Sequence, residues 1–225
     1  MTRSDPDGAS GVCVRRGRAP ALAERGGSGQ GEPADWIAQS PLLSRAFTLA
    51  EKAHGTQRRP SDGRLFLDHV TEVADFLHRV GYDDELVAAG LLHDSVERGT
   101  LEESELRSEM PAQVASLVMT LSEDGEIESF GQRKEALRSQ VAAAGGRAIT
   151  VFAADKLSDI LGLRRGIEAH PDQIEERIDG GVEAMVGHYR ESVQMIAAVR
   201  PGSAFLSALR RELERLEEHG IDGRA

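Results

Sequence analysis

The sequence predicts an all-α protein, and three observations lead to that prediction. Apolar residues recur at the spacing of a helix face through most of the chain from residue 40 onward. Residues that typically start and stop helices separate these apolar segments. Aromatic residues make up only 4% of the chain, while Ala and Leu are abundant, and this composition suits packed helices better than a β-sandwich. We therefore expect one helical bundle.

The first two expected helices have clear boundaries. Ser40 is a good N-cap and Pro41 suits the first helical position, so a helix is expected from there to about His54. Residues 55–64 form a polar loop that carries several arginines. A second amphipathic helix follows, and it is expected to stop at Gly81 because glycine commonly ends a helix.

The next segment leads to a histidine and an aspartate in succession. Asp83 or Asp84 is expected to cap a helix that runs as far as the pair His93 and Asp94. Residues 100–103 have the capping-box pattern Thr-Leu-Glu-Glu, which predicts a short helix.

The second half of the chain continues as helices. Pro111 is expected to open a helix, and residues 122–129 form an acidic loop. Further helices are expected at about 130–143, 147–165, 172–198 and 203–219. The apolar stripe of the last helix either packs on the domain or mediates self-association. Its members are Phe205, Leu206, Leu209, Leu213 and Leu216.

Residues 1–35 differ from the rest of the chain. They contain Gly, Pro, Ser and Arg but no aromatic residue and no periodic pattern, so we expect a disordered N-terminal tail. Interspersed acidic residues and the lack of a following hydrophobic segment argue against a secretory signal. Residues 36–225 can bury a substantial core, and we expect them to form a single domain.

Charge and cysteine content narrow the function. The net charge is −11, and the tail holds five basic and five acidic side chains, so the whole excess falls on residues 36–225. An acidic body argues against long nucleic acid as a partner, although a local arginine cluster still allows a small phosphorylated substrate. Cys13 is the single cysteine, so no intrachain disulfide can form. A single cysteine fits a reducing compartment, so we expect a cytoplasmic protein. No stretch reaches the roughly 20 apolar residues of a membrane span.

Four ionisable residues stand inside apolar, helix-patterned stretches, namely His69, His93, Asp94 and Asp155. Charged groups in such surroundings are costly unless they are paired or bound to a metal. Two imidazoles and two carboxylates form the mixed nitrogen and oxygen set that suits a divalent transition metal. Considered alone, His69 could be an ordinary core histidine, and Asp155 could form a buried salt bridge. Together the four residues predict a metal site.

The order of these motifs resembles that of the HD-domain metal-dependent phosphohydrolases. The likeness is greatest to the hydrolase domain of the RelA/SpoT alarmone enzymes and their small single-domain relatives, and it covers residues 42–198. Residues 53–59 resemble the family segment His-x-x-Gln-x-Arg, and residues 66–69 stand where the family has Tyr-x-x-His-Pro. Residues 91–97 match Leu-Leu-His-Asp-x-x-Glu, and residues 155–159 resemble Asp-Arg/Lys-Leu-x-Asn. This resemblance implies an HD-domain helical bundle.

The resemblance also implies roles for individual residues. The two histidines and two aspartates would bind one metal ion, and Glu97 would orient or deprotonate the attacking water. In a continuous helix, Glu97 lies one turn beyond the His-Asp pair and shares its face. A surface glutamate is the alternative for Glu97, and a solvated position is the alternative for each arginine. The candidates for substrate binding are Arg59, Arg58, Lys156, Asp159 and Arg98.

Five positions depart from the family pattern. Arg98 follows Glu97 where alarmone hydrolases have an aspartate, and Asp159 replaces an asparagine near the nucleotide. The other departures are Gly162 for threonine, Pro60 for lysine and Val70 for proline. Metal binding is therefore better supported by the sequence than alarmone specificity.

The expected activity is the hydrolysis of a phosphate or pyrophosphate ester of a small nucleotide-like substrate. The resemblance implies one divalent ion, with Mn²⁺ as the family's choice, while the ligand set also allows Fe²⁺, Zn²⁺ or Co²⁺. Guanosine 3′,5′-bis(diphosphate) is the leading specific substrate by resemblance. Two alternatives remain open: a non-catalytic sensor that binds metal and nucleotide, and a helical interaction module in which the four residues are structural.

Overall fold

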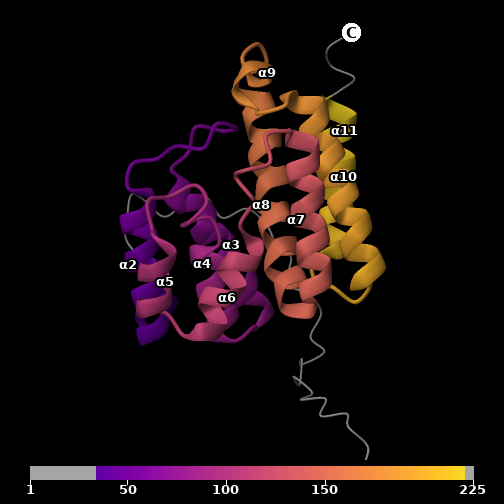
Figure 1. The fold of residues 1–225 in the computed structure, drawn as a ribbon. Helices are drawn as coiled ribbons and strands as arrows, with labels where there is room; N and C mark the ends of the chain where they lie inside the picture. Colours follow the sequence, from indigo (N-terminus) through magenta and orange to yellow (C-terminus); the bar gives the residue numbers. More distant parts are fainter. Residues whose placement is uncertain (1–33, 221–225) are drawn as a thin grey trace, which may run out of the picture.

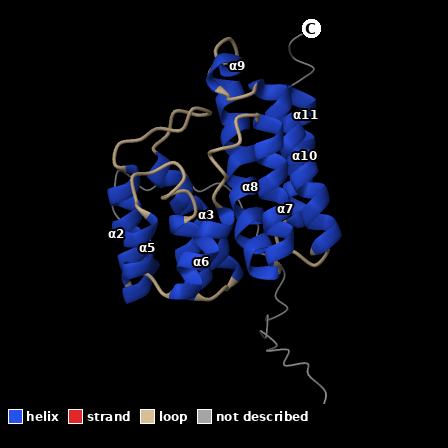
Figure 2. Cartoon of the chain, viewed as in Figure 1, coloured by secondary structure: helices blue, strands red, loops and turns tan. Residues whose placement is uncertain are grey.

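The computed structural model describes residues 34–220, which fold into helices joined by loops (Figure 2). In this part of the chain the only β-type pairing is an isolated bridge between Arg58 and Leu65. The predicted all-α class is confirmed. The predicted disordered tail lies outside the described residues as far as residue 33, and Asp35 already begins the first helix. The helices are α1 (Asp35–Ala38), α2 (Pro41–His54), α3 (Phe66–Val80), α4 (Asp84–Leu92), α5 (Glu103–Glu109), α6 (Ala112–Leu121), α7 (Phe130–Ala144), α8 (Gly146–Ala169), α9 (Ile174–Arg177), α10 (Gly181–Val199) and α11 (Leu206–Gly220).

The longest helix, α8, lies at the centre of the bundle (Figure 1). It packs against α3, α4 and α6 from the earlier part of the chain and against α7, α10 and α11 from the later part. Because α8 has neighbours on both sides, its residues between Ala148 and Leu163 are nearly all buried. These include Asp155, Lys156 and Ser158, so charged and polar groups face the interior where the two groups of helices meet.

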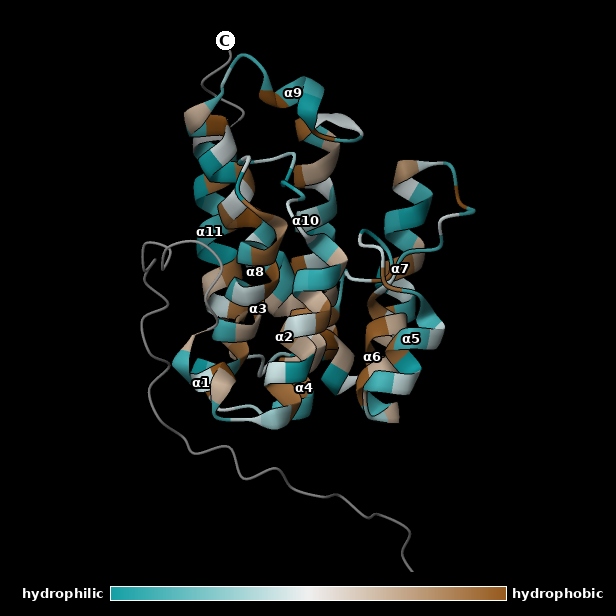
Figure 3. Ribbon diagram, turned by 90° about the vertical axis from the view of Figure 1, so that its left-hand side faces the viewer, coloured by the Kyte–Doolittle hydropathy of each residue, from teal (hydrophilic) through white to brown (hydrophobic). Residues whose placement is uncertain are grey.

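Hydropathy follows the position of each helix in the bundle. Figure 3 shows mainly hydrophilic residues on the short outer helix α5 and mainly apolar residues on α6. The apolar residues of α11 are buried against α8 and α10, so the C-terminal helix packs on the domain. Among the described helices, none is long and apolar enough to cross a bilayer.

Several predicted helix boundaries are confirmed by their capping interactions. The hydroxyl of Ser40 accepts a hydrogen bond from the Leu43 N–H at 3.4 Å, with Pro41 as the first helical residue. Gly81 ends α3 in the left-handed conformation, at φ 90°. The carboxylate of Asp83 accepts from the Leu86 N–H at 2.9 Å and caps α4. Local sequence therefore fixes where α2 and α4 begin and where α3 ends.

Two predicted helices differ from the structure. The short helix whose capping box was expected at residues 100–103 begins only at Glu103. The Thr100 N–H instead donates to the Ala53 carbonyl at 3.2 Å and ties this segment to α2. The single helix expected at 172–198 is divided into α9 and α10. Gly180 and Gly181 have φ values of 77° and 83°, a conformation that an α-helix cannot continue through.

Candidate metal centre and active site

Side chains from three parts of the chain converge beside α8. His69 lies in the first turn of α3, His93 and Asp94 directly follow α4, and Asp155 lies in the middle of α8. The Nε2 atoms of His69 and His93 are 3.3 Å apart, and Asp155 Oδ1 lies 3.4 and 3.3 Å from them. Asp94 Oδ2 lies 3.8 and 3.6 Å from the same two nitrogens. The structure thus brings together all four residues that the sequence nominated as metal ligands.

The spacing of the ligand atoms of His69, His93 and Asp155 fits a single bound cation. Atoms that each lie about 2.1 Å from one ion are about 3.0 to 3.4 Å apart at octahedral or tetrahedral angles. The distances among His69, His93 and Asp155 fall in that range, and those to Asp94 are slightly longer. Two imidazole nitrogens with carboxylate oxygens can hold Mn²⁺, Fe²⁺, Zn²⁺ or Co²⁺.

Hydrogen bonds on the far side of each imidazole orient the ligand nitrogens. His93 Nδ1 lies 2.9 Å from the Gly90 carbonyl, which can only accept, so Nδ1 carries the proton and Nε2 presents its lone pair. His69 Nδ1 lies 2.9 Å from Ser158 Oγ, whose hydroxyl donates to Glu72 Oε2 at 2.5 Å. The chain from carboxylate to hydroxyl to imidazole fixes the same tautomer in His69. Neither Ser158 nor Glu72 was singled out by the sequence.

The His-Asp pair lies on a turn, whereas the sequence predicted that a helix would run as far as the pair and that helical spacing would carry on to Glu97. Helix α4 ends at Leu92, and residues 93–98 form successive turns in which the Arg98 N–H donates to the Asp94 carbonyl at 2.9 Å. The Gly90 carbonyl, which would accept from the backbone in a further helical turn, accepts from the His93 side chain. The irregular backbone therefore follows from the orientation of His93 towards the other ligands.

The electrostatics of this cluster favour a cation among its carboxylates. Burial opposes the charged form of His93, but the carboxylates of Asp94 and Asp155 outweigh it and raise the pKa of His93 to about 9. Burial likewise opposes ionisation of Asp155, yet Lys156 and His93 hold the pKa of Asp155 well below its usual range. Burial and the nearby charge of Arg59 lower the pKa of His69, so its Nε2 lone pair is free to bind a metal.

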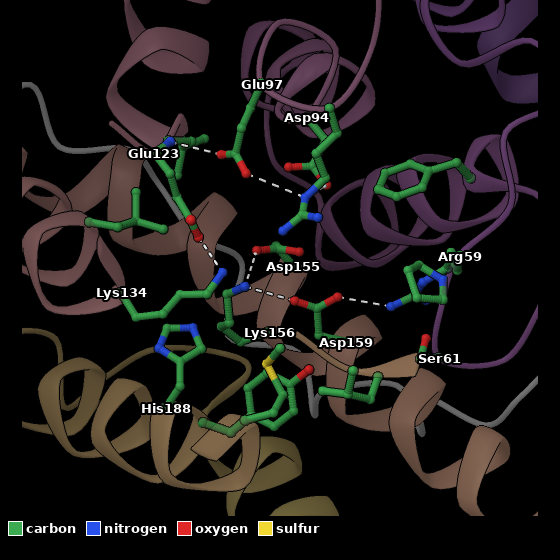
Figure 4. Close-up of a pocket in the computed structure, with 18 residues that line it drawn as sticks. Arg59, Ser61, Asp94, Glu97, Glu123, Lys134, Asp155, Lys156, Asp159 and His188 are labelled. Carbon is green, nitrogen blue, oxygen red and sulfur yellow. Dashed lines mark hydrogen bonds and ion pairs between the residues drawn. The ribbon is translucent and has the colours of Figure 1, made fainter. Parts of the chain in front are cut away.

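A cavity of about 100 Å³ opens beside the ligand residues (Figure 4). Its walls come from the loop before α3, the turn after α4, and helices α7, α8 and α10, with apolar residues such as Phe66 and Leu137 between the charged groups. The charged residues that line it are Arg59, Asp94, Glu97, Arg98, Glu123, Lys134, Asp155, Lys156 and Asp159.

Glu97 lines this cavity on the same side as Asp94 (Figure 4). Its Oε2 accepts a hydrogen bond from the Glu123 N–H at 2.7 Å, so the backbone of the acidic loop holds the carboxylate in place. Burial raises the pKa of Glu97, and the negative charge of Asp94 adds to the effect. A positioned carboxyl group with a raised pKa beside a metal site is suited to proton transfer.

Arg98, the most conspicuous departure from the family pattern, turns towards the site. Its Nε lies 3.6 Å from Asp94 Oδ2 and 3.4 Å from Glu97 Oε1, although 42% of the side chain is exposed. Arg98 therefore contacts both a metal-ligand candidate and the candidate base at the edge of the cavity.

Asp159 joins two of the predicted cationic residues in one buried cluster. Its Oδ1 accepts from Arg59 Nη2 at 2.8 Å, and its Oδ2 accepts from Lys156 Nζ at 2.7 Å. The guanidinium of Arg59 lies against Gly162, where an added Cβ would meet it at 2.7 Å. The departures at 159 and 162 are thus linked, because an acid pairs with Arg59 at one position and a glycine makes room for it at the other.

Other candidates lie elsewhere or were missed. Arg58 donates to the Gly63 carbonyl at 2.8 Å and does not line the cavity. Lys134, which was not among the predicted site residues, lines the cavity and pairs with Glu123. His188 also lines the cavity and was not among the predicted site residues. His188 lies far along the chain from the recognised motifs, so no pattern in the sequence marks this position.

The fold and the ligand geometry define an HD-domain protein, and the comparison of families agrees. The HD domain family matches residues 46–180, which is more than half of the chain, so the chain belongs to this family. The match includes all four metal-ligand candidates together with Glu97.

Two curated relatives come from the alarmone enzymes. A guanosine-3′,5′-bis(diphosphate) 3′-pyrophosphohydrolase of Aquifex aeolicus is 29% identical over 120 residues, which cover 52% of this chain and 17% of that protein. A probable GTP diphosphokinase of rice is 30% identical over 145 residues, which cover 60% of this chain and 20% of that protein. The chain therefore spans a fifth or less of the length of these relatives.

Two solved structures share the fold. One is a metazoan ortholog of SpoT described as hydrolysing ppGpp, with a TM-score of 0.62, 19% identity, and coverage of 85% of this chain and 98% of that one. The other is a Listeria monocytogenes protein, with a TM-score of 0.60, 24% identity, and coverage of 67% of this chain and 99% of that one. The helical arrangement around α8 is thus that of the RelA/SpoT hydrolase domain.

Proposed function

We propose that the protein is a metal-dependent phosphohydrolase that cleaves a phosphate or pyrophosphate ester of a small nucleotide-like substrate. The observation that carries this proposal is the close approach of His69, His93 and Asp155. Asp94 lies beside the two imidazoles, next to a cavity that Glu97 also lines. Mn²⁺ is the proposed ion because of the family resemblance.

The four ligand residues would hold the cation, and the remaining charged residues would handle proton and phosphate. A bound divalent cation lowers the pKa of a coordinated water and polarises a phosphoryl oxygen. Glu97 accepts the proton of the water as its oxygen attacks phosphorus and the P–O bond to the leaving group breaks. The backbone N–H of Glu123 keeps the Glu97 carboxylate directed at the cavity during this step.

Substrate phosphate would meet cations held in fixed positions. Arg59 is only 6% exposed and is held by Asp159, so it presents its guanidinium without a large loss of side-chain entropy. Lys156 is held in the same way between Asp155 and Asp159, at 2.9 and 2.7 Å. Asp159 could also accept a hydrogen bond from a nucleobase or ribose hydroxyl.

Guanosine 3′,5′-bis(diphosphate) is the substrate we propose first. The support is the motif resemblance, the Aquifex aeolicus relative that carries this activity in its name, and the fold shared with a SpoT ortholog described as hydrolysing ppGpp. The reaction would release pyrophosphate from the 3′ position by attack of water.

The proposal can be tested on the full chain after removal of metal and reloading with Mn²⁺, Fe²⁺, Zn²⁺ or Co²⁺. Product release from guanosine 3′,5′-bis(diphosphate) is measured beside a panel of ordinary nucleotides. Asp94→Ala should abolish turnover and stoichiometric metal binding. Asp68→Ala changes an exposed carboxylate near His69 in α3 and should leave both unchanged. A properly loaded wild-type protein that turns over none of these substrates would contradict the proposal.

A sensor without turnover is the second candidate, and the position of Arg98 favours it. The guanidinium of Arg98 neutralises Glu97 and Asp94 where the alarmone hydrolases have a further acid. In this case nucleotide binds the metal-loaded protein, no product is released, and Arg98→Asp restores hydrolysis. Product formation by the wild-type protein would eliminate the sensor, and a lack of stoichiometric metal would favour an interaction module.

A further inference from the structure

His188 lines the cavity, and one of its ring nitrogens has no hydrogen-bond partner. It belongs to α10, is 3% exposed, and lines the cavity near Lys134 and Lys156 (Figure 4). Its Nδ1 lies 2.7 Å from Arg138 Nη1. Its Nε2 is buried and has no hydrogen-bond partner among the described residues.

Arg138 determines which ring nitrogen of His188 carries the proton. A guanidinium remains protonated in proteins and can only donate, so Nδ1 must accept the hydrogen bond. The neutral imidazole therefore carries its proton on Nε2. Burial together with the charges of Lys156, Lys134 and Arg138 lowers the pKa of His188 to about 2, which keeps the ring neutral over the physiological range. The unpartnered ring nitrogen of His188, a residue that lines the cavity, is thus an N–H donor.

The surroundings of this donor select its partner. A buried N–H without an acceptor is unfavourable, and such groups in folded proteins commonly mark a place for a ligand. The positive charges that disfavour protonation of His188 equally favour an anionic acceptor beside it. Figure 4 shows His188 next to Lys134, with Lys156 between His188 and the carboxylates of Asp155 and Asp94.

We propose that His188 donates a hydrogen bond from Nε2 to a phosphate oxygen at the end of the substrate that is not cleaved. This inference rests on the proposed function and narrows it, because it requires a nucleotide with two separate anionic ends. One end lies at the metal ligands, and the other lies between His188 and Lys134. Arg138 is a positioning residue, since it acts on the ligand only through the tautomer of His188.

Two substitutions separate the donor from the packing of the ring. His188→Asn keeps a side-chain oxygen near Nδ1 that can accept from Arg138, but it lacks an N–H at the Nε2 position. His188→Gln extends an amide N–H to about the Nε2 position. Equilibrium dissociation constants are measured with Mn²⁺-loaded Glu97→Gln protein, which blocks turnover in the proposed mechanism. The two ligands are guanosine 3′,5′-bis(diphosphate) and guanosine 3′-diphosphate, which has no 5′ phosphate.

The expected result is specific to one end of the ligand. Loss of a hydrogen bond to a charged group corresponds to about 10-fold to 100-fold in affinity. His188→Asn should weaken binding of the bis(diphosphate) by that factor and binding of the 3′-diphosphate less than about twofold. His188→Gln should recover part of the loss. Imidazole ¹⁵N spectra of the wild-type protein should show the proton on Nε2, with a shift when the bis(diphosphate) is added.

Three outcomes would overturn the proposal. Equal losses with both nucleotides would make His188 a packing residue, and unchanged affinities would remove it from the binding site. A proton on Nδ1 in the spectra would refute the tautomer assignment even if a variant failed to fold. Failure of the proposed function would give a different result, because the Glu97→Gln protein with His188 unchanged would then bind neither nucleotide.

Discussion

At the scale of single residues, Ser158 is expected to control metal affinity without touching the metal. Its hydroxyl donates to Glu72 and accepts from His69 Nδ1, so it fixes the ring whose Nε2 faces the other ligands. Loss of such an outer partner typically weakens metal binding about 10-fold to 100-fold. Titration of metal-free Ser158→Ala with Mn²⁺ should show this weakening. Ser44→Ala removes a hydroxyl bonded to the Ile37 carbonyl and is the matched control.

Asp159 is expected to stabilise the folded protein in a pH-dependent manner. Burial and the Asp155 carboxylate oppose its ionisation, but the charges of Lys156 and Arg59 outweigh them and lower its pKa to about 2. An aspartate in the unfolded chain has a pKa of about 3.9, so the stabilisation is present above that value and disappears as pH falls through about 2.

Asp159→Asn should therefore reduce the free energy of unfolding by about 2 to 3 kcal/mol at pH 7 and by about half as much at pH 3. Urea denaturation at the two pH values measures the difference. Asp75→Asn, at a partly exposed pair with Arg79, should cost less than about 1 kcal/mol. A loss for Asp159→Asn that does not depend on pH would show that the ion pairs are not its cause.

At the scale of secondary-structure elements, Gly166 is expected to hold the loop that carries Arg59 close to α8. A Cβ at this position would lie 2.1 Å from the Ser61 carbonyl oxygen and 2.9 Å from Ile174 Cδ1. Since the first contact is with backbone, Gly166→Ala has to displace the loop and should cost about 1 to 3 kcal/mol in unfolding free energy.

The matched control is Gly187→Ala in the interior of α10, where an added Cβ meets nothing within 4 Å. This substitution should stabilise the helix by about 0.5 to 1 kcal/mol. Thermal or urea denaturation of both variants measures the contrast. If both substitutions stabilise the protein, or both destabilise it, a clash with Ser61 is not what distinguishes the two sites.

Elements whose ends depend on local chemistry were predictable from the sequence. The Ser40 and Asp83 caps and the Gly81 stop act over three or four residues, and each is found where the pattern predicted it. The turn after α4 was not predictable, because it follows from the position of His93 among ligands that come from α3 and α8. The helix start predicted at Thr100 was wrong for the same reason, since a carbonyl on α2, distant in the sequence, accepts a hydrogen bond from the Thr100 N–H.

The candidate site likewise contains residues that were predictable from the sequence and residues that were not. Four ionisable residues in apolar segments were detectable because their polarity contrasts with their neighbours along the chain. Ser158, Glu72 and His188 showed no such contrast, and their importance arises from contacts that join residues 50 to 89 positions apart. Helical periodicity carries no information about contacts of this kind.

At the scale of the whole molecule, the metal-ligand candidates connect the two groups of helices. His69, His93 and Asp94 belong to the group of α3 and α4, whereas Asp155 belongs to the central helix α8, on which α7, α10 and α11 also pack. A cation bound by all four therefore binds the folded chain and finds no equivalent site in the unfolded chain.

Removal of metal should consequently lower the unfolding temperature of the entire bundle. An ion present at about 1,000 times its dissociation constant stabilises the native state by about 4 kcal/mol. For a chain of this size each 1 kcal/mol corresponds to about 2 to 4 °C, so chelation should lower the midpoint by about 10 °C. Calorimetry with and without Mn²⁺ measures this shift. The Asp94→Ala variant should melt at the same temperature in both conditions. The Asp68→Ala control should show the same shift as the wild type. An ion held by two histidines and an aspartate from the group of α3 and α4, and by an aspartate from α8, cannot leave without a loss of stability. Identical melting of the wild-type protein with and without Mn²⁺ would therefore mean that the four side chains form a structural cluster.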